Sequence, residues 1–443
     1  MLHLPTIAEM NPWWEVPTAR CATAFPARRD FQRRLVDFAR EEGRRAFVVL
    51  GPRQVGKSVA LHQVADDLLD ESWPPGNLTH FDFSDDRIVE AISPREIASI
   101  EPPGMVPGRP RLLLLDEITR APRWQEWLKQ AVDLAESIRI IATGSVASAL
   151  REGSRESGQG RWDEFRVGGL TFDEHLRFHS APLRISSHEV LRRNPNEVER
   201  YLQLGGFPEH VLETEYGRSR ARIRADIADR AIARDLANTG IDVEGVRRLF
   251  VYLAAESGAI FSARERARDL DVDERSIKSW IDRLLDAQLI ARLDQHSKGS
   301  KRLRTKPKIY AEDHGLVSAF AASPVARDDA AAYGHIVETA VYRHLRHAYD
   351  DPRAELRYFR GDGDFEGDFV VGVGGDPIVV EVTSSRIVKP SKIARLRRVG
   401  AVIGTKRLTI IHVGFTDHES DGVRLLPLER FLIDPRILEN VDV

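Results

Sequence analysis

A glycine-rich loop between an apolar run and a helical pattern constrains this chain more than any other feature. The apolar run ends at Leu50, and the next eight residues read G-P-R-Q-V-G-K-S before a helical periodicity starts at Val59. This order of strand, G-x-x-x-x-G-K-S loop and helix is the one that phosphate-binding P-loops require. An ordinary glycine-rich turn has no use for a lysine and a serine together at its end.

Each residue type in the loop has a physical use in phosphate binding. The two glycines let backbone N–H groups turn toward phosphate oxygens, and the following helix places its positive dipole end there. Lys57 supplies a positive charge to the outer phosphates, and Ser58 offers a hydroxyl to Mg²⁺. We therefore predict nucleotide contacts from Gly51, Pro52, Arg53, Gln54, Val55, Gly56, Lys57, Ser58 and Val59.

Two carboxylates follow a second apolar run. Residues 112–115 are all leucine, and Asp116 and Glu117 come directly after them. A buried parallel strand has such a continuous apolar sequence. We expect Asp116 to bind the metal ion and Glu117 to act on the water that attacks the γ-phosphate, because the added acid suits hydrolysis. The alternative is that both are surface acids at the end of a core strand.

A third apolar run, residues 138–142, ends in Thr143-Gly144-Ser145. A small hydroxyl at the end of a neighbouring strand could sense the γ-phosphate, and Ser145 is our candidate for that role. Because polar residues are common at strand ends, this signal only supports the two stronger ones.

Composition is typical of a cytoplasmic multidomain protein. The 443 residues are 42% hydrophobic with a net charge of −3, which suits about two to four domains and excludes a global attraction to nucleic acid or membranes. The single cysteine, Cys21, has no intramolecular partner and fits a reducing compartment. The sequence shows no secretory leader and no apolar run near the about 18 residues of a membrane span. We therefore expect a cytoplasmic location and no membrane contact.

The alternation of strand and helix patterns predicts an α/β fold in several parts. Residues 1–44 form an N-terminal segment with a helical pattern from Phe31 to Arg40. Strand and helix signals then alternate, which favours a parallel sheet with crossover helices. We predict a P-loop NTPase parallel-sheet domain at 45–172, a helical lid at 173–242, a winged helix at 243–325, and a C-terminal α/β restriction-endonuclease-like domain at 326–443.

The winged-helix prediction depends on the order of elements between residues 243 and 325. Helical patterns cover Arg247 to Glu256 and Glu274 to Leu289, with a helix between them that Ser262 is placed to cap. Residues 289–293 and 307–310 would form the wing strands.

The wing is strongly basic. Six of the eleven positions from 298 to 308 are lysine or arginine, and such charges give salt-dependent binding when they contact the phosphates of duplex DNA. The alternative is a structural module with a solvated hairpin. We favour a structural role or nonspecific contact, because the second helix is mixed in charge. The basic residues are Lys298, Lys301, Arg302, Arg304, Lys306 and Lys308.

An acidic cluster is expected in the last segment. Two apolar runs flank Gly374-Gly375, and a hairpin turn centred there places Asp368 opposite Glu381. Opposed like charges destabilise a hairpin, so we expect a compensating cation, most simply Mg²⁺. With Glu338 on the preceding helix, Asp368 and Glu381 form a three-carboxylate set of the kind used by metal-dependent nucleases.

One position departs from that nuclease pattern. A nuclease site wants a lysine two residues beyond the second carboxylate, and this chain has Thr383 there. Lys389 or Lys392 in the following helix could replace it, although nothing in the sequence demands this. We favour an inactive nuclease-like fold over an active nuclease or an unrelated fold.

In this order, these motifs resemble a group of prokaryotic AAA-superfamily ATPases that carry a C-terminal domain of unknown function numbered 4143. The resemblance covers most of the chain. Its motifs are residues 51–58, Leu115-Asp116-Glu117, Thr143-Gly144-Ser145, Gly160-Arg161, residues 170–174, Gly205-Gly206-Phe207-Pro208, Lys308-Ile309-Tyr310, Asp313-His314-Gly315-Leu316 and Gly334 to Glu338.

This resemblance implies further roles. Arg161 would be the arginine finger, although Arg151 and Arg155 lie in the same stretch, and Gly206 with Pro208 would lie near the adenine. Such fingers usually act on a neighbouring subunit, so the resemblance also implies a homo-oligomer. The group usually has lysine where this chain has Thr383, which weakens a nuclease role.

We therefore expect Mg²⁺-dependent binding and hydrolysis of ATP that moves the winged helix and the C-terminal domain. One alternative is a switch or scaffold that binds ATP and hydrolyses it slowly. Another is an ATP-regulated nuclease or DNA-binding protein. The resemblance and the lack of a guanine-reading motif favour ATP over GTP.

Overall fold

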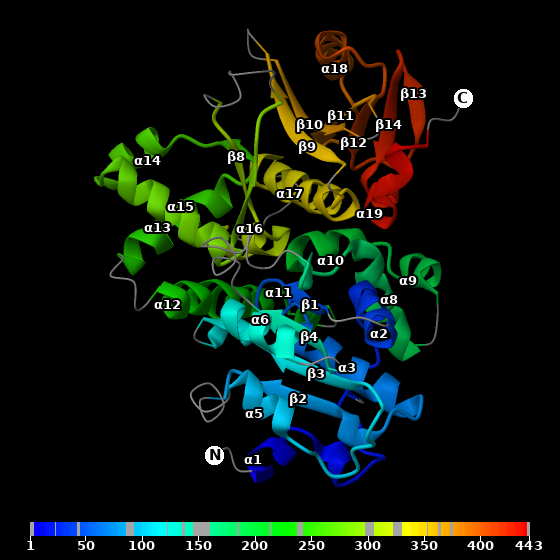
Figure 1. The fold of residues 1–443 in the computed structure, drawn as a ribbon. Helices are drawn as coiled ribbons and strands as arrows, with labels where there is room; N and C mark the ends of the chain where they lie inside the picture. The colour runs from blue at the N-terminus through cyan, green and yellow to red at the C-terminus, as the bar shows by residue number, and fades with distance from the viewer. Residues whose placement is uncertain are drawn as a thin grey trace. The chain divides into compact units, whose positions relative to one another are not determined.

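The chain divides into two compact units, which are described separately (Figure 1). The first comprises residues 1–168 with 181–184 and 286–288, and the second comprises residues 169–180, 185–285 and 289–443. The computed structural model describes residues 4–22, 24–41, 45–85, 93–121, 123–134, 138–144, 160–183, 186–211, 213, 215–236, 242–296, 305–321, 330–351, 353–361, 365–372 and 375–440.

A parallel sheet forms the centre of the first unit. Its described strands run in the order β2-β3-β4-β1-β5, and every neighbouring pair is parallel. The strands β1 to β4 are buried almost throughout, whereas β5 at one edge is partly exposed. The apolar runs predicted this burial for β1, β3 and β4, but β2 reads L-T-H-F-D and has no such run. The bounds are β1 Ala46–Leu50, β2 Leu78–Asp82, β3 Arg111–Asp116, β4 Ile138–Gly144 and β5 Trp162–Arg166.

Helices pack around this sheet. The helical pattern that we predicted from Phe31 to Arg40 is confirmed as α2, and the helix after the glycine-rich loop is α3. The described helical elements of this unit are α1 Leu4–Glu9, η1 Pro12–Trp14, α2 Asp30–Arg40, α3 Lys57–Asp70, η2 Pro75–Asn77, α5 Pro94–Ser99, η3 Ile118–Arg120 and α6 Trp124–Leu134.

The N-terminal segment covers the edge strand β2. The indole nitrogens of Trp13 and Trp14 donate hydrogen bonds to the Leu78 carbonyl oxygen at 3.0 and 2.9 Å. The buried Asn11 side chain accepts from the His80 N–H at 2.6 Å and donates to the His80 carbonyl at 2.9 Å. These contacts satisfy backbone polar groups of an edge strand, which could otherwise pair with a strand of another chain. The N-terminal segment is therefore part of the folded domain.

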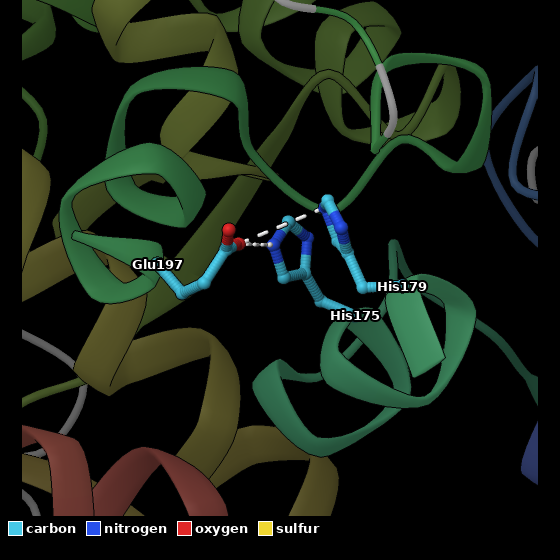
Figure 2. A group of neighbouring side chains, drawn as sticks. All are labelled: His175, His179 and Glu197. Atoms are coloured by element: carbon cyan, nitrogen blue, oxygen red, sulfur yellow. Dashed lines mark hydrogen bonds and ion pairs between the residues drawn. The ribbon is translucent and has the colours of Figure 1, made fainter. Parts of the chain in front are cut away.

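The second unit begins with a set of helices. Two of them, α8 and α10, bring His175, His179 and Glu197 next to one another (Figure 2). The described elements here are α8 Phe172–Leu183, α9 Ser187–Arg193, α10 Glu197–Leu204, η5 Pro208–His210, α11 Tyr216–Arg222, the π-helix η6 Ile223–Asp229 and α12 Arg230–Leu236.

The next segment has the order of elements that we predicted for a winged helix. Its described strands form an antiparallel sheet in the order β6-β8-β7. Ser262 is the N-cap residue of α14, although its hydroxyl makes no capping hydrogen bond. The winged-helix assignment itself stays a prediction. The bounds are α13 Val243–Ala255, β6 Ala259–Ile260, α14 Ala263–Leu270, α15 Glu274–Asp286, β7 Ile290–Leu293 and β8 Lys308–Ala311.

The structure describes only two of the six basic residues that we assigned to the wing. Lys298, Lys301, Arg302 and Arg304 lie outside the described residues. Lys306 is exposed and pairs with Glu265 at 3.0 Å. Lys308, in contrast, is buried, with 4% of its side chain exposed. We were therefore wrong to count Lys308 among the charges that face DNA.

A mixed sheet dominates the C-terminal part. In the described residues its strands run in the order β13-β14-β12-β11-β10-β9. The pairs Phe369↔Val380 and Val371↔Ile378 confirm the hairpin register that we predicted. The bounds are α16 His314–Phe320, α17 Ala330–Ala348, β9 Glu355–Arg360, β10 Glu366–Gly372, β11 Ile378–Thr383, α18 Pro390–Ile403, β12 Leu408–His412, β13 His418–Ser420, β14 Val423–Pro427, α19 Leu428–Ile433 and η8 Pro435–Leu438.

Across the described parts of both units, no helix combines the length and the apolar character that a membrane crossing needs.

Candidate functional site

The glycine-rich loop lies at the carboxyl edge of the parallel sheet, between the end of β1 and the start of α3. Gly56, the residue before α3, has a φ of 91°, which favours glycine. A Cβ on Gly51 would lie 2.5 Å from the Val167 carbonyl oxygen. Both glycines of the motif are therefore required by the backbone, as the P-loop prediction implies.

Lys57 is folded back onto this loop. Its ammonium donates hydrogen bonds to the carbonyl oxygens of Gly51 and Pro52, each at 2.8 Å. Burial lowers the pKa of Lys57, while the nearby carboxylates of Glu117 and Asp116 oppose this shift. The lysine charge is thus held within the loop, close to both predicted acids. Ser58, the next residue, is exposed in the first turn of α3.

The two acids lie at the end of β3, at the same edge of the sheet as the loop. Strand β4 runs between β3 and β1, so its last residues lie between the acids and the loop. Thr143 of β4 is buried, and its hydroxyl donates a hydrogen bond to Asp116 Oδ1. The Thr143 hydroxyl oxygen in turn accepts a hydrogen bond from the Glu117 N–H at 3.1 Å. Thr143 therefore links both acids to β4, the strand that lies between β3 and β1.

Thr143 is the residue that our sequence reasoning ranked too low. We singled out the motif Thr143-Gly144-Ser145 but chose Ser145 as the functional hydroxyl, and Ser145 lies outside the described residues. The sequence did indicate Thr143, because it is the first polar residue after the apolar run 138–142 and so lies at the end of that strand.

Arg161 lies at the amino ends of the strands, whereas the glycine-rich loop lies at their carboxyl ends. Its carbonyl accepts a hydrogen bond from the Ala46 N–H at 2.8 Å, at the amino end of β1. Its guanidinium pairs with Asp133 at 3.0 Å. A strand the length of β1 spans about 17 Å at 3.3 Å per residue. Arg161 is therefore far from the glycine-rich loop of its own chain.

Gly206 and Pro208, which the resemblance placed near an adenine, belong to the second unit. The Gly206 N–H donates to both carboxylate oxygens of Asp313, at 3.1 and 3.2 Å, and its carbonyl accepts from the Leu170 N–H. A Cβ on Gly206 would lie 2.7 Å from the Arg343 guanidinium and from the Leu170 backbone. This glycine is thus needed for close packing within its own unit, and its role near a nucleotide stays a prediction.

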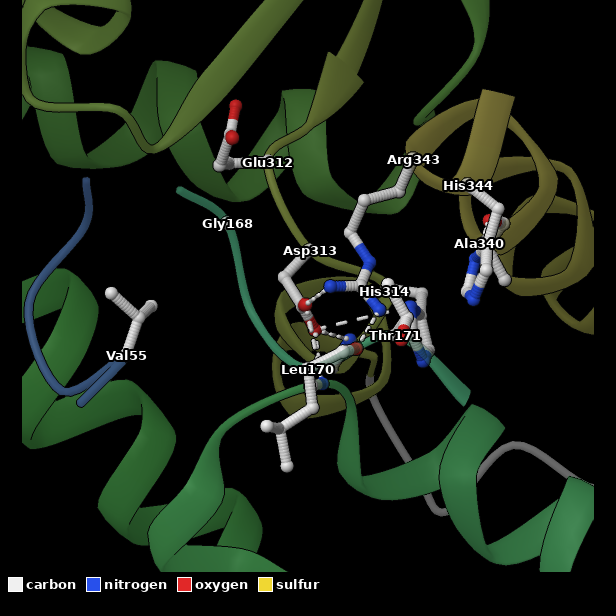
Figure 3. Close-up of polar contacts among 12 residues, drawn as sticks. Val55, Gly168, Leu170, Thr171, Glu312, Asp313, His314, Ala340, Arg343 and His344 are labelled. Atoms are coloured by element: carbon white, nitrogen blue, oxygen red, sulfur yellow. Dashed lines mark hydrogen bonds and ion pairs between the residues drawn. The ribbon is translucent and has the colours of Figure 1, made fainter. Parts of the chain in front are cut away.

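Asp313 connects two of the sequence motifs, residues 205–208 and 313–316, with Arg343 of α17 (Figure 3). Besides Gly206, it accepts from the Gly315 N–H at 2.8 Å at the start of α16 and pairs with Arg343 of α17 at 3.3 Å. Asp313 and Arg343 are 2% and 5% exposed. Removing one partner of such a buried pair leaves an uncompensated charge, so the pair specifies how these segments fit together.

The C-terminal acids surround a lysine. The Lys308 ammonium lies 3.2 Å from Glu338 Oε1, 3.3 Å from Asp368 Oδ1 and 2.6 Å from Glu366 Oε1. Tyr310 also donates to Glu338 at 2.8 Å. Burial, together with the Asp368 charge, raises the pKa of Glu338 to about 7 even though Lys308 opposes the shift.

Glu381 has its own cations. Lys392 donates to Glu381 Oε1 at 2.8 Å, and Arg395 also pairs with this carboxylate. Burial raises the pKa of Glu381. We expected Mg²⁺ to compensate the opposed acids, whereas side-chain cations from β8 and α18 do so here. The sequence could not show this, because Lys308 is far from Asp368 along the chain. Of the two lysines that we considered, Lys392 is the one that reaches the cluster.

Family models match three stretches of the chain. Residues 43–176 match the AAA domain, residues 195–326 match a domain of unknown function (DUF8612), and residues 333–431 match the domain of unknown function DUF4143.

Two mycobacterial relatives cover nearly the whole chain, and a third relative covers part of it. Uncharacterized proteins of Mycobacterium bovis and Mycobacterium tuberculosis are each 28% identical over 94% of this chain and 87% of their own. An uncharacterized protein of Haemophilus influenzae is 24% identical over 61% of this chain and 67% of its own.

Solved structures give weaker matches. The Aeropyrum pernix ORC1 protein in complex with DNA has a TM-score of 0.30 at 13% identity and covers 70% of this chain and 96% of its own. AMPPCP-bound DnaA from Aquifex aeolicus has a TM-score of 0.28 at 16% identity, with 58% of this chain and 89% of its own covered. The restriction-endonuclease-like interpretation stays a prediction. The motifs, the parallel sheet and the family matches thus agree on an AAA-type P-loop domain at residues 43–176, and residues 333–431 match the DUF4143 domain.

Proposed function

We propose that this protein binds ATP with Mg²⁺ at the glycine-rich loop and hydrolyses it, and that the nucleotide state changes the arrangement of its C-terminal parts. One observation carries the proposal: Lys57 of the loop and the acids Asp116 and Glu117 occupy the same edge of the sheet, with Thr143 hydrogen-bonded to both acids. An isolated loop would bind phosphate, but the acids add the groups that hydrolysis needs.

The residues present fit ATP and Mg²⁺. Ser58 and Asp116 offer the hydroxyl and carboxylate oxygens that Mg²⁺ prefers, and the ion would neutralise charge on the outer phosphates. Lys57 donates to two neutral carbonyl oxygens, and exchange toward a phosphate oxygen would bring its ammonium to an anionic acceptor, which forms a stronger hydrogen bond. Glu117 follows Asp116 with a φ of 52° and serves in our proposal as the group that orients the attacking water.

Arg161 extends the proposal to an assembly. Because it lies at the amino edge of β5, it can act only on the nucleotide of a neighbouring copy. An arginine supplied in this way contributes about 10³-fold or more to the rate of phosphoryl transfer. We therefore expect a homo-oligomer, with low ATP turnover by the isolated chain.

The test is ATP turnover by the purified full chain over a range of protein concentrations, with Glu117→Gln as the blank. Turnover per chain should rise with concentration and should fall in Arg161→Ala. The matched control is Arg45→Ala, because Arg45 is at the same edge of the sheet and pairs with Asp163 at 3.2 Å. Concentration-independent turnover that Arg161→Ala leaves unchanged would remove the intersubunit role, and turnover equal to the blank at all concentrations would favour a nucleotide switch.

Duplex DNA is the partner we propose for the basic residues at 298–306, without the buried Lys308. Adding DNA to the same assay should raise turnover in a salt-dependent manner. Turnover that is present but indifferent to DNA would point to a protein client instead.

A further inference from the structure

Two histidines one helical turn apart on α8 face a glutamate in the first turn of α10 (Figure 2). His175 and His179 are four residues apart, so their side chains lie on one face of the helix. Glu197 reaches them from a different helix of the same unit. None of these residues belongs to the nucleotide site or to the acidic cluster around Lys308.

The distances among the three side chains suit a shared metal ion. Glu197 Oε2 lies 3.1 Å from His175 Nε2 and 3.6 Å from His179 Nε2. Among the residues that the structure describes, these three can each offer one ligand atom within 4.8 Å of the other two. Four ligands at about 2.0–2.1 Å around tetrahedral Zn²⁺ lie about 3.3 Å from each other. The two distances to Glu197 are thus already close to this value, and the third pair lies within 4.8 Å.

The site is buried, and its donors are in the right chemical form. The side chains of His175, Glu197 and His179 are 0%, 6% and 13% exposed. Burial lowers the pKa of His175 to about 4 and also lowers that of His179. Both imidazoles are thus neutral near pH 7, which leaves each ring a lone pair for a metal.

Hydrogen bonding alone leaves the cluster incompletely satisfied. His175 uses one ring nitrogen toward Glu197, and its buried Nδ1 has no hydrogen-bond partner in the described part of the chain. His179 Nε2 lies 2.8 Å from the Val211 carbonyl oxygen. That carbonyl also accepts from Arg200 at 2.6 Å, so it keeps a donor if His179 turns to a metal. The nearby Arg200 charge opposes a cation at this position.

We propose that His175, His179 and Glu197 bind one divalent transition-metal ion, Zn²⁺ by the donor set, with water completing the coordination. Two imidazoles and one carboxylate are typical ligands of Zn²⁺, whereas Mg²⁺ prefers oxygen ligands alone. The ion would link α8 to α10 and thereby stabilise the packing of the first helices of the second unit. All three ligands lie within the second unit.

Titration of the metal-depleted, tag-free full chain with Co²⁺ tests this proposal, because four-coordinate Co²⁺ absorbs visible light and Zn²⁺ displaces it. A Cys21→Ser background removes the only thiol. We expect one ion per chain. Glu197→Gln keeps the shape and a hydrogen-bond acceptor for His175, and it should weaken Co²⁺ at least about tenfold, the loss that even outer-shell partners cause. His179→Gln, at the least buried position of the three, should do the same.

The control is His418→Gln, which changes an exposed histidine outside the cluster and should leave Co²⁺ affinity unchanged. Thermal unfolding gives a second readout, since Zn²⁺ should raise the Tm of the wild-type chain and of His418→Gln by mass action but not that of the two site variants. Equal Co²⁺ affinity in the site variants and the control would overturn the proposal, as would the absence of any Co²⁺ absorption by the folded wild-type chain.

Discussion

Replacing Lys308 by methionine should destabilise the second unit strongly. The ammonium lies within 3.3 Å of three carboxylates, those of Glu338, Glu366 and Asp368. Only 4% of the lysine side chain is exposed. Methionine keeps much of the apolar stem, so the substitution removes mainly the charge.

The size of the effect follows from that burial. Removing one partner of a buried ion pair costs about 3–5 kcal/mol, because it leaves uncompensated charge out of water. Here the loss brings like-charged groups into opposition, although protonation of Glu338 would relieve part of it. At about 2–4 °C per kcal/mol, we expect the Tm of this unit to fall by about 10 °C.

Differential scanning calorimetry of the full chain measures this change. Lys278→Met is the matched control, because Lys278 pairs with Glu274 at 2.7 Å while 64% of its side chain is exposed. That surface pair should contribute no more than about 0.5 kcal/mol. Millimolar Mg²⁺ should also raise the Tm of Lys308→Met more than that of the wild type, since it can replace the missing cation. Equal Tm values for the two lysine variants would refute the reasoning.

Three further substitutions test single contacts. Thr143→Val removes the hydroxyl that bonds to Asp116, and a lost hydrogen bond to a charged group, about 1.5–3 kcal/mol, should lower kcat about 10–100-fold with ATP affinity kept; an unchanged kcat in a steady-state assay would contradict this role. Gly206→Ala should destabilise the second unit by about 1–3 kcal/mol, because its Cβ meets Arg343 at 2.7 Å, and calorimetry should show no such loss in Gly217→Ala, where the new Cβ has nothing within 4 Å. The pKa of Glu338 is raised to about 7, so between about pH 4.5 and 7 the folded state binds more protons than the unfolded state, and wild-type stability falls as the pH rises through this window. Relative to the wild type, Glu338→Gln should therefore gain up to about 3 kcal/mol of unfolding free energy by pH 8. If denaturant titrations give the two proteins the same dependence of unfolding free energy on pH, the pKa shift is excluded.

Local sequence was sufficient for the features that depend on spacing within one segment. The glycine-rich loop, the acids after the leucine run and the register that pairs Phe369 with Val380 all follow from neighbouring residues and simple periodicity. A turn centre and a period of two determine a hairpin register, and a G-x-x-x-x-G-K-S loop determines where a helix begins.

Features that depend on distant pairing were not predictable in the same way. Nothing in the local pattern of β8 indicates that Lys308 meets acids of α17 and β10, and nothing near Arg161 indicates that β5 pairs with β1. The N-terminal segment appeared to be a simple lead-in, yet Trp13 and Trp14 are buried in the main core. Such contacts depend on strand order and tertiary packing, which one sequence without relatives does not specify.

ATP binding by Lys57→Ala tests the central claim most directly. Equilibrium binding to the full chain in the presence of Mg²⁺ should be at least about tenfold weaker in this variant than in wild type, since the loop loses the lysine charge that we propose contacts the outer phosphates. Lys129→Ala in α6 of the same unit is the control and should bind ATP as wild type does. If Lys57→Ala binds ATP as tightly as Lys129→Ala, the nucleotide site does not lie at this loop.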